Sequence, residues 1–217
     1  MPLPMVHFAV AIRLSERFGQ FPSADFLLGS IAPDAIHMRQ QANLGDKLIT
    51  HLLQPADTPD HAHVRALLTK YADMPAPYPV FTAGYAAHLL TDRLWSSTVT
   101  EPLYAQLPPD IDDAARRKLY YLETDQSDCN LYRSMPWQPE VWSHLAQATA
   151  PDFLPLVSAA EIDRWCERSL HWFEDSAHEP HITTQYLTDS LVKNFIIQAV
   201  KYVESHFDAW QIVDPFA

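Results

Sequence analysis

The segment GYAAHLLTDRLW at residues 84–95 sets one histidine and one aspartate into a largely apolar run. The pattern is typical of a buried helix. His88 and Asp92 are four residues apart, so a helix would place both side chains on one face. Buried polar groups need partners, which a hydrogen bond within the core or a shared divalent cation can supply. We expect the cation, and we expect the other important polar residues to converge on this pair.

The composition predicts one helical domain. No linker, charge block or internal repeat divides the 217 residues, so we expect a single domain over residues 1–217. A hydrophobic fraction of 47% is typical of a globular chain. With 4 glycines and 18 prolines, glycine-dependent hairpins are difficult to build, whereas prolines can end helices between periodic segments. The fold class expected is therefore all-α, a single-domain helical bundle.

Apolar periodicity and capping signals place the helices. They are expected near residues 4–18, 24–30, 61–71, 80–97, 113–133, 140–147, 159–176 and 184–207, and a short apolar segment at 47–53 follows an expected loop at 40–45. The expected N-caps are Ser23, Asp112, Ser158 with a capping box to Glu161, and either Asp57 or Asp60.

Charge and sorting signals narrow the classes of partner. The net charge is −12, with 15 basic and 27 acidic residues, which argues against a nucleic-acid polymer as a general partner. A small phosphorylated substrate or a phospholipid held through metal remains compatible with it. No apolar run reaches the ~18 residues of a membrane span, and the N-terminus lacks a signal-peptide pattern, so we expect a cytoplasmic protein. Cys129 and Cys166 form no disulfide or metal motif. The oligomeric state is left open.

The first 92 residues contain side chains of the types that bind divalent metals. These are His7, Asp34, His37, His51, His88 and Asp92. Each has an ordinary alternative, such as a half-buried histidine or a turn aspartate. Pro33 favours an extended Ala32, so we expect the chain to turn there and to present Asp34 at a fixed point. His61 and His63 are expected to face solvent.

Four blocks of sequence carry a family resemblance. An early histidine, FLLGSIAPD at 26–34, TH at 50–51 and GYAAHLLTDRLW at 84–95 occur in an order that resembles the zinc-dependent phospholipase C family and the related S1/P1 nucleases. The blocks cover about the first hundred residues. The resemblance implies that His7 and Asp92 bind one zinc, that Asp34, His51 and His88 bind a neighbouring zinc, and that Asp92 bridges the two.

The chain departs from the secreted phospholipases after Asp92. Those enzymes complete a third zinc site with a further histidine and a later His-xxx-Glu pair. Here no histidine lies between His88 and His144, and His171 and Glu174 are only three residues apart. We therefore expect one or two zinc ions, with nickel, manganese or iron as alternatives because imidazole and carboxylate ligands suit all of them.

Other polar residues are secondary candidates. Asp125 and Asp128 interrupt an amphipathic helix and, three residues apart, can face one metal. The alternative is a solvated acidic face, which would also include Glu123. Arg39 and Arg93 are candidates for binding a substrate phosphate, although ion pairs within the fold explain them as well. The aromatic side chains that can pack against substrate or simply fill the core are Tyr85, Trp95 and Tyr121.

These patterns favour a metal-dependent phosphoesterase, a phospholipase C-like hydrolase. Metal-activated water would attack a phospholipid headgroup, a nucleotide or another phosphodiester. Asp34, Asp125 or Asp128 would orient or deprotonate that water. The alternatives are a helical metal-binding protein without hydrolytic activity, such as a sensor or scaffold, and a structural domain whose histidines are buried without function. The adjacent His-Asp dipeptide of HD-domain phosphohydrolases is absent.

Overall fold

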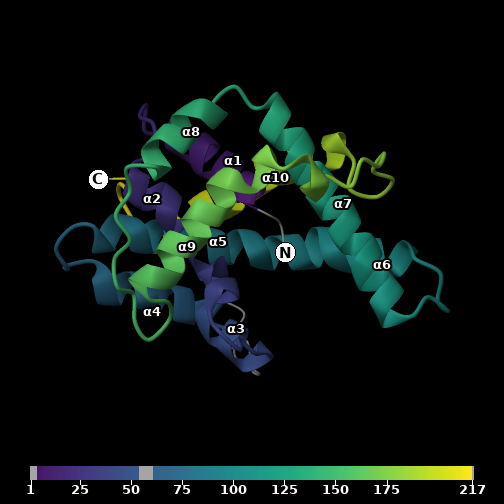
Figure 1. The fold of residues 1–217 in the computed structure, drawn as a ribbon. Coiled ribbons are helices and arrows are strands. Elements are labelled where there is room, and N and C mark those ends of the chain that lie inside the picture. The colour runs from purple at the N-terminus through teal and green to yellow at the C-terminus, as the bar shows by residue number, and fades with distance from the viewer. Residues whose placement is uncertain (1–3, 54–60, 217) are drawn as a thin grey trace.

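The structure, a computed structural model, describes residues 4–53 and 61–216 and is helical throughout, with no β-strand in those ranges (Figure 1). The all-α prediction is confirmed. The α-helices are α1 (Pro4–Glu16), α2 (Ala24–Gly29), α3 (Leu44–Thr50), α4 (Ala62–Tyr71), α5 (Tyr78–Trp95), α6 (Glu101–Gln106), α7 (Asp113–Ser134), α8 (Gln138–Leu145), α9 (Ala159–His171) and α10 (Asp189–Ala209). Shorter elements are the 3-10 helices η1 (Ala32–Met38), η3 (Trp172–Glu174) and η4 (Ser176–His178), and the π-helical turn η2 (Ser96–Thr100).

Helix α5 runs through the middle of the molecule (Figure 1) and packs against α2, α4, α10 and α1. Its closest crossing is with α2, where Gly29 and Gly84 let the two backbones approach. A Cβ atom on Gly29 would collide with the carbonyl oxygen of Phe81, and one on Gly84 would collide with that of Phe26. The crossing therefore depends on both glycines, and it brings the segment after α2 directly against α5.

The predicted caps form where the structure describes them. The side chains of Ser23, Asp112 and Ser158 each accept a hydrogen bond from an amide in the first turn of the helix that follows. Glu161 completes the capping box with Ser158. These signals act within four residues, which is why the sequence alone reveals them.

Several predicted boundaries are wrong. Ala32 is not extended: it begins η1, because Pro33 in the first turn of a helix needs no amide hydrogen. The loop expected at residues 40–45 ends earlier, because Asn43 caps helix α3, which begins at Leu44. The chain after α5 continues as η2 and α6, which the sequence did not predict.

The C-terminal half differs in similar ways. Helix α9 ends at His171 and gives way to η3 and η4, and α10 begins at Asp189 behind a Thr188 cap, later than expected. The alternative caps Asp57 and Asp60 lie outside the described residues.

Two other expectations concern the whole chain. Both cysteines are buried and free. Among the described helices, none combines the length and the apolarity needed to cross a membrane.

Candidate metal centre

Five of the predicted ligands meet beside α5. His88 and Asp92 project from α5, His7 from α1 and Asp34 from η1, and His51 is the C-cap of α3. The ligand atoms of His7, His88 and Asp92 lie within 4.8 Å of one another, and so do those of Asp34, His51 and His88. The side chain of Asp92 is 10% exposed, and the other four residues are almost completely buried. Four separate segments thus contribute to one small polar cluster.

Asp92 is the centre of this cluster. Its Oδ1 lies 3.5 Å from His7 Nε2, and its Oδ2 lies 3.6 Å from the Nε2 atoms of both His51 and His88. Asp34 Oδ1 lies 3.4 Å from His51 Nε2. These separations are longer than ordinary hydrogen bonds. They are close to the roughly 3.4 Å that separates two atoms bound at ~2.1 Å to one tetrahedral ion. Both oxygens of Asp92 therefore face imidazole nitrogens in a way that suits a bridging carboxylate.

The cluster contains buried polar atoms that lack hydrogen-bond partners within the described residues. They are His7 Nδ1 and Nε2, Asp34 Oδ1, His51 Nε2, His88 Nε2 and Asp92 Oδ1. Each such group costs about 1–3 kcal/mol when it is left unsatisfied. A divalent cation would satisfy most of them at once. The donor set of imidazole nitrogens and carboxylate oxygens fits zinc and several other divalent metals.

Hydrogen bonds fix which nitrogen of two histidines can serve as a ligand. His88 Nδ1 lies 2.8 Å from the carbonyl oxygen of Ser30. His51 Nδ1 lies 3.2 Å from the carbonyl oxygen of Lys47. A carbonyl can only accept, so His88 Nδ1 carries a proton and, in the neutral ring, Nε2 presents a lone pair toward Asp92. His51 Nδ1 also lies 3.0 Å from the hydroxyl of Thr50, which can donate or accept, and these contacts direct His51 Nε2 toward Asp34. This arrangement is common around metal-bound histidines.

The ring of His7 stacks on that of His88, with centroids 3.8 Å apart and planes at 9°. Burial and the charge of His88 lower the pKa of His7 to about 4, although Asp92 opposes the shift. His7 is therefore neutral at pH 7, as a metal ligand must be.

The pKa values of the two carboxyl groups shift in the direction that keeps both groups ionised. Burial alone would raise the pKa of Asp92, but His88 and His7 outweigh it and hold that pKa well below its usual value. Burial likewise opposes ionisation of Asp34, yet contact with His51 and the charges of His88 and His51 lower its pKa to about 2. The pKa of His88 is raised because Asp92 and Asp34 outweigh its burial. Two ionised carboxylates thus require positive charge between them, from a proton on His88 or from a cation.

His37 lies at the edge of the cluster. Its Nε2 is 3.7 Å from Asp34 Oδ1, and its side chain is 47% exposed. Neither group of ligand atoms includes it. The structure therefore separates His37 from the five convergent side chains, although it remains beside one of them.

Asp125 and Asp128 do not belong to either group of ligand atoms. Burial raises the pKa of Asp125 to about 6. Asp128 is buried and accepts a hydrogen bond of 3.1 Å from the amide of Met5, and burial raises its pKa well above the usual range. The solvated acidic face considered as the alternative is wrong for Asp128 and for Glu123, which are both 2% exposed.

The two arginines predicted to bind phosphate have partners within the fold. Arg39 pairs with Glu161 at 2.7 Å and with Asp46 at 3.1 Å. Arg93 donates to the carbonyl oxygen of Leu52 at 3.2 Å. The ion-pair alternative therefore describes Arg39, and both guanidinium groups hold segments of the fold together.

Tyr85 has a role that the sequence did not reveal. It is completely buried, and its hydroxyl donates to the carbonyl oxygen of Thr50 at 2.6 Å, next to His51. It thereby fixes the end of α3 to α5. Trp95 is also buried in the core, whereas Tyr121 is 58% exposed. No sequence signal shows which carbonyl group a tyrosine in an apolar run will reach.

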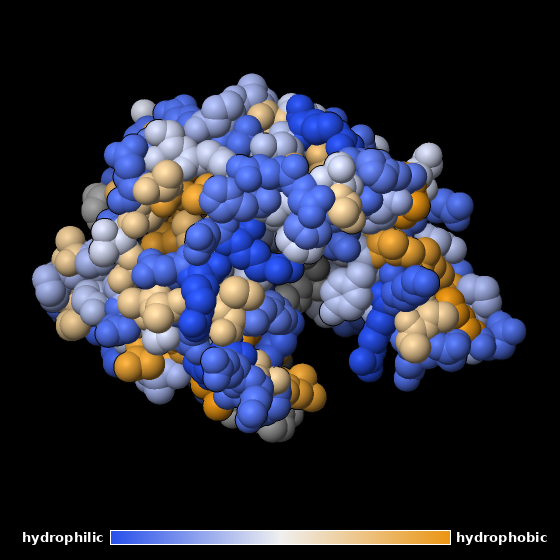
Figure 2. All heavy atoms as spheres, viewed as in Figure 1, coloured by the Kyte–Doolittle hydropathy of each residue, from blue (hydrophilic) through white to orange (hydrophobic). Residues whose placement is uncertain are grey.

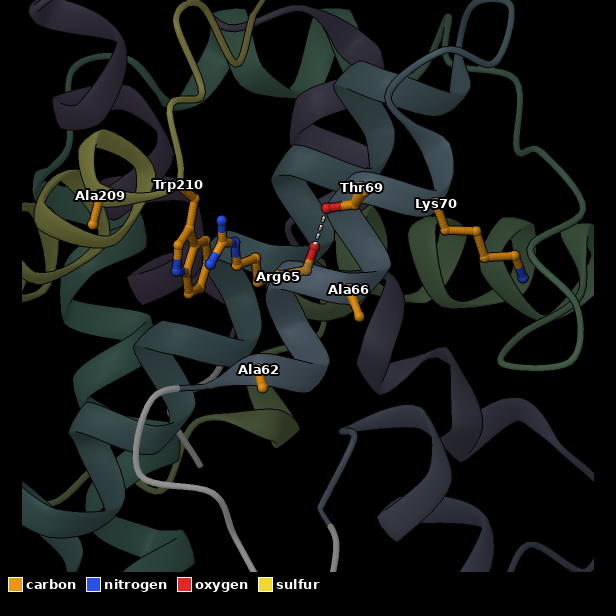
Figure 3. A pocket seen from close by; sticks show the side chains of 7 residues that line it. All are labelled: Ala62, Arg65, Ala66, Thr69, Lys70, Ala209 and Trp210. Atoms are coloured by element: carbon orange, nitrogen blue, oxygen red, sulfur yellow. Dashed lines mark hydrogen bonds between the residues drawn. The ribbon is translucent and has the colours of Figure 1, made fainter.

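A wider surface cavity of about 700 Å³ lies between α4 and the end of α10 (Figure 3). Arg65 lies beside the indole of Trp210, and Lys70 points away from it (Figure 3). The cavity is lined by Ala62, Arg65, Ala66, Thr69, Lys70, Ala209 and Trp210. None of the predicted site residues lines it, so its size does not make it the candidate centre.

Comparisons with protein-family models, with curated proteins and with solved structures found no match. The case for a function therefore rests on the side chains themselves.

Proposed function

We propose that this chain is a metal-dependent phosphoesterase whose centre resembles that of the zinc-dependent phospholipases C. One observation carries the proposal: buried and unpartnered ligand atoms converge from α1, η1, α3 and α5 on a single carboxylate, Asp92. Core histidines without a function would find partners among protein groups.

The residues that would hold the metal follow from the two groups of ligand atoms. His7, His88 and Asp92 would hold one divalent ion, and Asp34 and His51, with His88 or Asp92, a neighbouring one. Ions bound in this way supply Lewis acidity, which makes a bound water acidic and stabilises charge on phosphoryl oxygens. The protein fixes the imidazole rings through Ser30 and Lys47, so that the nitrogen lone pairs stay aligned.

Hydrolysis also needs a group that accepts a proton from the attacking water. Asp34 lies within the centre, whereas Asp125 has the pKa, about 6, that best matches general-base catalysis near neutral pH. Burial raises the pKa of Asp128 well above its usual value, and the carboxyl group already accepts a hydrogen bond from the amide of Met5. We therefore assign the proton transfer to Asp34 or Asp125 and not to Asp128. Asp125→Asn separates the two, because it lowers kcat without loss of metal only if Asp125 is the base.

Metal analysis combined with a hydrolysis assay tests the proposal. Purified protein should contain divalent metal and hydrolyse bis(p-nitrophenyl) phosphate, and a chelator should abolish the activity. Asp92→Ala should lose both the metal and the activity. The matched control is Asp110→Ala, which removes an exposed aspartate outside the centre and should change neither. Unchanged metal content in Asp92→Ala would contradict the proposal.

A second candidate is a metal-binding protein without hydrolytic activity. The low exposure of the cluster favours it, because His7, His51 and His88 are at most 3% exposed. Structural metal sites are closed, whereas catalytic sites keep a position open for water or substrate. Bound metal without hydrolysis of phosphomonoesters or phosphodiesters would select this second function.

A further inference from the structure

A smaller cavity of about 140 Å³ lies between α7 and α9. It is lined by Pro4, Asp125, Asp128, Trp165, Arg168, Ser169, Trp172 and Phe173. Its volume is roughly that of four or five water molecules, so it leaves room for a small chemical group. Figure 2 shows strongly hydrophilic side chains along α9, the helix that carries Arg168.

Aromatic rings hold the guanidinium of Arg168 at this cavity. Its Cζ atom lies 4.3 Å from the ring centroid of Trp172 and 6.0 Å from that of Trp165. The other partner of Trp172 is His178, whose ring is stacked on it at 3.8 Å and 4°. Such stacking orients a guanidinium without using its hydrogen-bond donors. Arg168 forms no ion pair with any residue that the structure describes, in contrast to Arg39.

The cavity and the candidate metal centre are neighbours. Helix α9 packs against η1. The ring centroid of Trp165 is 5.7 Å from that of His37, and His37 Nε2 is 3.7 Å from Asp34 Oδ1. The guanidinium of Arg168 lies over the other side of this contact, with its Cζ atom 6.0 Å from the ring centroid of Trp165. A series of contacts through Trp165 and His37 therefore links Arg168 to Asp34, and no described residue forms an ion pair with the guanidinium.

We propose that Arg168 is a substrate-binding residue that contacts the phosphoryl oxygens of a small phosphoester. The inference rests on the proposed function, because it places the phosphate between the metal centre and the guanidinium. A guanidinium presents two parallel N–H donors that match two phosphate oxygens. It supplies the role that Arg39 and Arg93, which are engaged elsewhere, do not fill.

The test measures phosphate binding as well as catalysis. Inorganic phosphate is titrated into zinc-loaded protein by calorimetry, and kcat and KM are measured with p-nitrophenyl phosphate. Arg168→Ala should weaken phosphate binding about 10- to 100-fold, which is the usual effect of losing a hydrogen bond to a charged group. KM should rise by a similar factor while the zinc content stays unchanged. Arg168→Lys should recover part of the loss.

Arg164 provides the matched control. It lies one turn earlier on α9, is exposed and does not line the cavity. Arg164→Ala should leave phosphate binding within about twofold. Phosphate binding in Arg168→Ala equal to that in Arg164→Ala would overturn the proposal, and so would zinc-loaded wild-type protein that binds no phosphate.

The outcomes separate this inference from the proposed function. If wild-type protein hydrolyses phosphoesters and Arg168→Ala behaves as wild type, the proposed hydrolase activity is supported and the proposed role of Arg168 is wrong. If wild-type protein hydrolyses no phosphoester but binds phosphate in a way that depends on Arg168, the anion site is supported and the proposed hydrolase activity is wrong.

Discussion

The candidate metal centre and the acidic segment of α7 both bury carboxyl groups, but the partners of these groups differ. Glu123 in α7 accepts hydrogen bonds of 2.9–3.1 Å from the amides of Gln185, Tyr186 and Leu187. Asp34 and Asp92 each keep a buried oxygen without a hydrogen-bond partner in the described residues. Buried carboxyl groups are therefore common to both regions, and only their partners distinguish them.

This difference shows which kind of burial indicates a ligand. In α7 the carboxylate of Glu123 holds the segment before α10 in place, and Asp128 holds the start of α1 through Met5. Backbone amides complete those interactions, so nothing further is needed. In the centre, imidazole nitrogens and carboxylate oxygens face one another at distances too long for hydrogen bonds. A cation is the partner that we propose for these atoms.

Metal removal should have the largest effect on stability. Protein saturated at about a thousand times the dissociation constant should lose about 4 kcal/mol of unfolding free energy when a chelator strips the metal. The reason is that the ligand atoms then have no other partners. Urea denaturation with and without chelator measures the loss. Asp92→Ala should show no response to the chelator. If the stability of wild-type protein is also unaffected by the chelator, the buried carboxyl groups of the centre do not depend on a cation.

Glu123→Gln should produce the next largest loss. The amide side chain offers one acceptor oxygen where two carboxylate oxygens now accept four hydrogen bonds. The cost should be on the order of 3 kcal/mol in urea denaturation. Metal content should stay unchanged, because this carboxylate serves the fold. Glu167→Gln, an exposed change on α9, is the control. If Glu123→Gln binds less metal than wild type, Glu123 contributes to the metal centre and not only to the fold.

Tyr85→Phe should have a smaller effect on stability but a specific effect on the centre. It removes the hydroxyl that holds the carbonyl group of Thr50, next to His51. We expect a loss of about 1 kcal/mol in unfolding free energy and about a tenfold loss of metal affinity. Competition with a chromophoric chelator measures the affinity. Tyr121→Phe removes an exposed hydroxyl and should change neither quantity. Equal affinities in the two variants would show that Tyr85 only fills the core.

The parts of the fold that were predictable depend on local geometry. His88 and Asp92 could be paired from the sequence because a helix fixes the direction of residues four apart. The caps at Ser23, Asp112 and Ser158 were predictable for the same reason. The expectation that five ligands converge on α5 came from the family resemblance, and no spacing rule supplies it.

The remaining features depend on contacts between distant segments. Glu123 meets amides more than sixty residues away, and no local pattern distinguishes it from a solvated glutamate. The approach of the Asp34 segment to α5 depends on Gly29 and Gly84, whose close contact exists only in the packed fold. A phosphate-binding role for Arg168 was not predicted, because a lone arginine on an exposed helix face gives no signal in the sequence until its neighbours in the fold are known.

Asp128→Asn should have the smallest effect on the free energy of unfolding, and the sign of that effect is the most informative result. Burial, with a contribution from Asp125, raises the pKa of Asp128 well above the usual value, against the hydrogen bond from Met5. The unfolded chain has a pKa near 3.9 at this position. The stability that the protonated group contributes is therefore complete below about pH 4 and is lost as the pH rises through the folded pKa.

Asparagine keeps the acceptor for the Met5 amide but does not titrate. The variant should match wild type at pH 4 and exceed its unfolding free energy by on the order of 1 kcal/mol at pH 8. Urea denaturation across that range measures the difference, with Asp110→Asn as the exposed control. If Asp128→Asn is instead less stable at pH 8, Asp128 is ionised in the fold. A buried anion in α7 would then need a cation of its own, and the distinction between the two regions would fail.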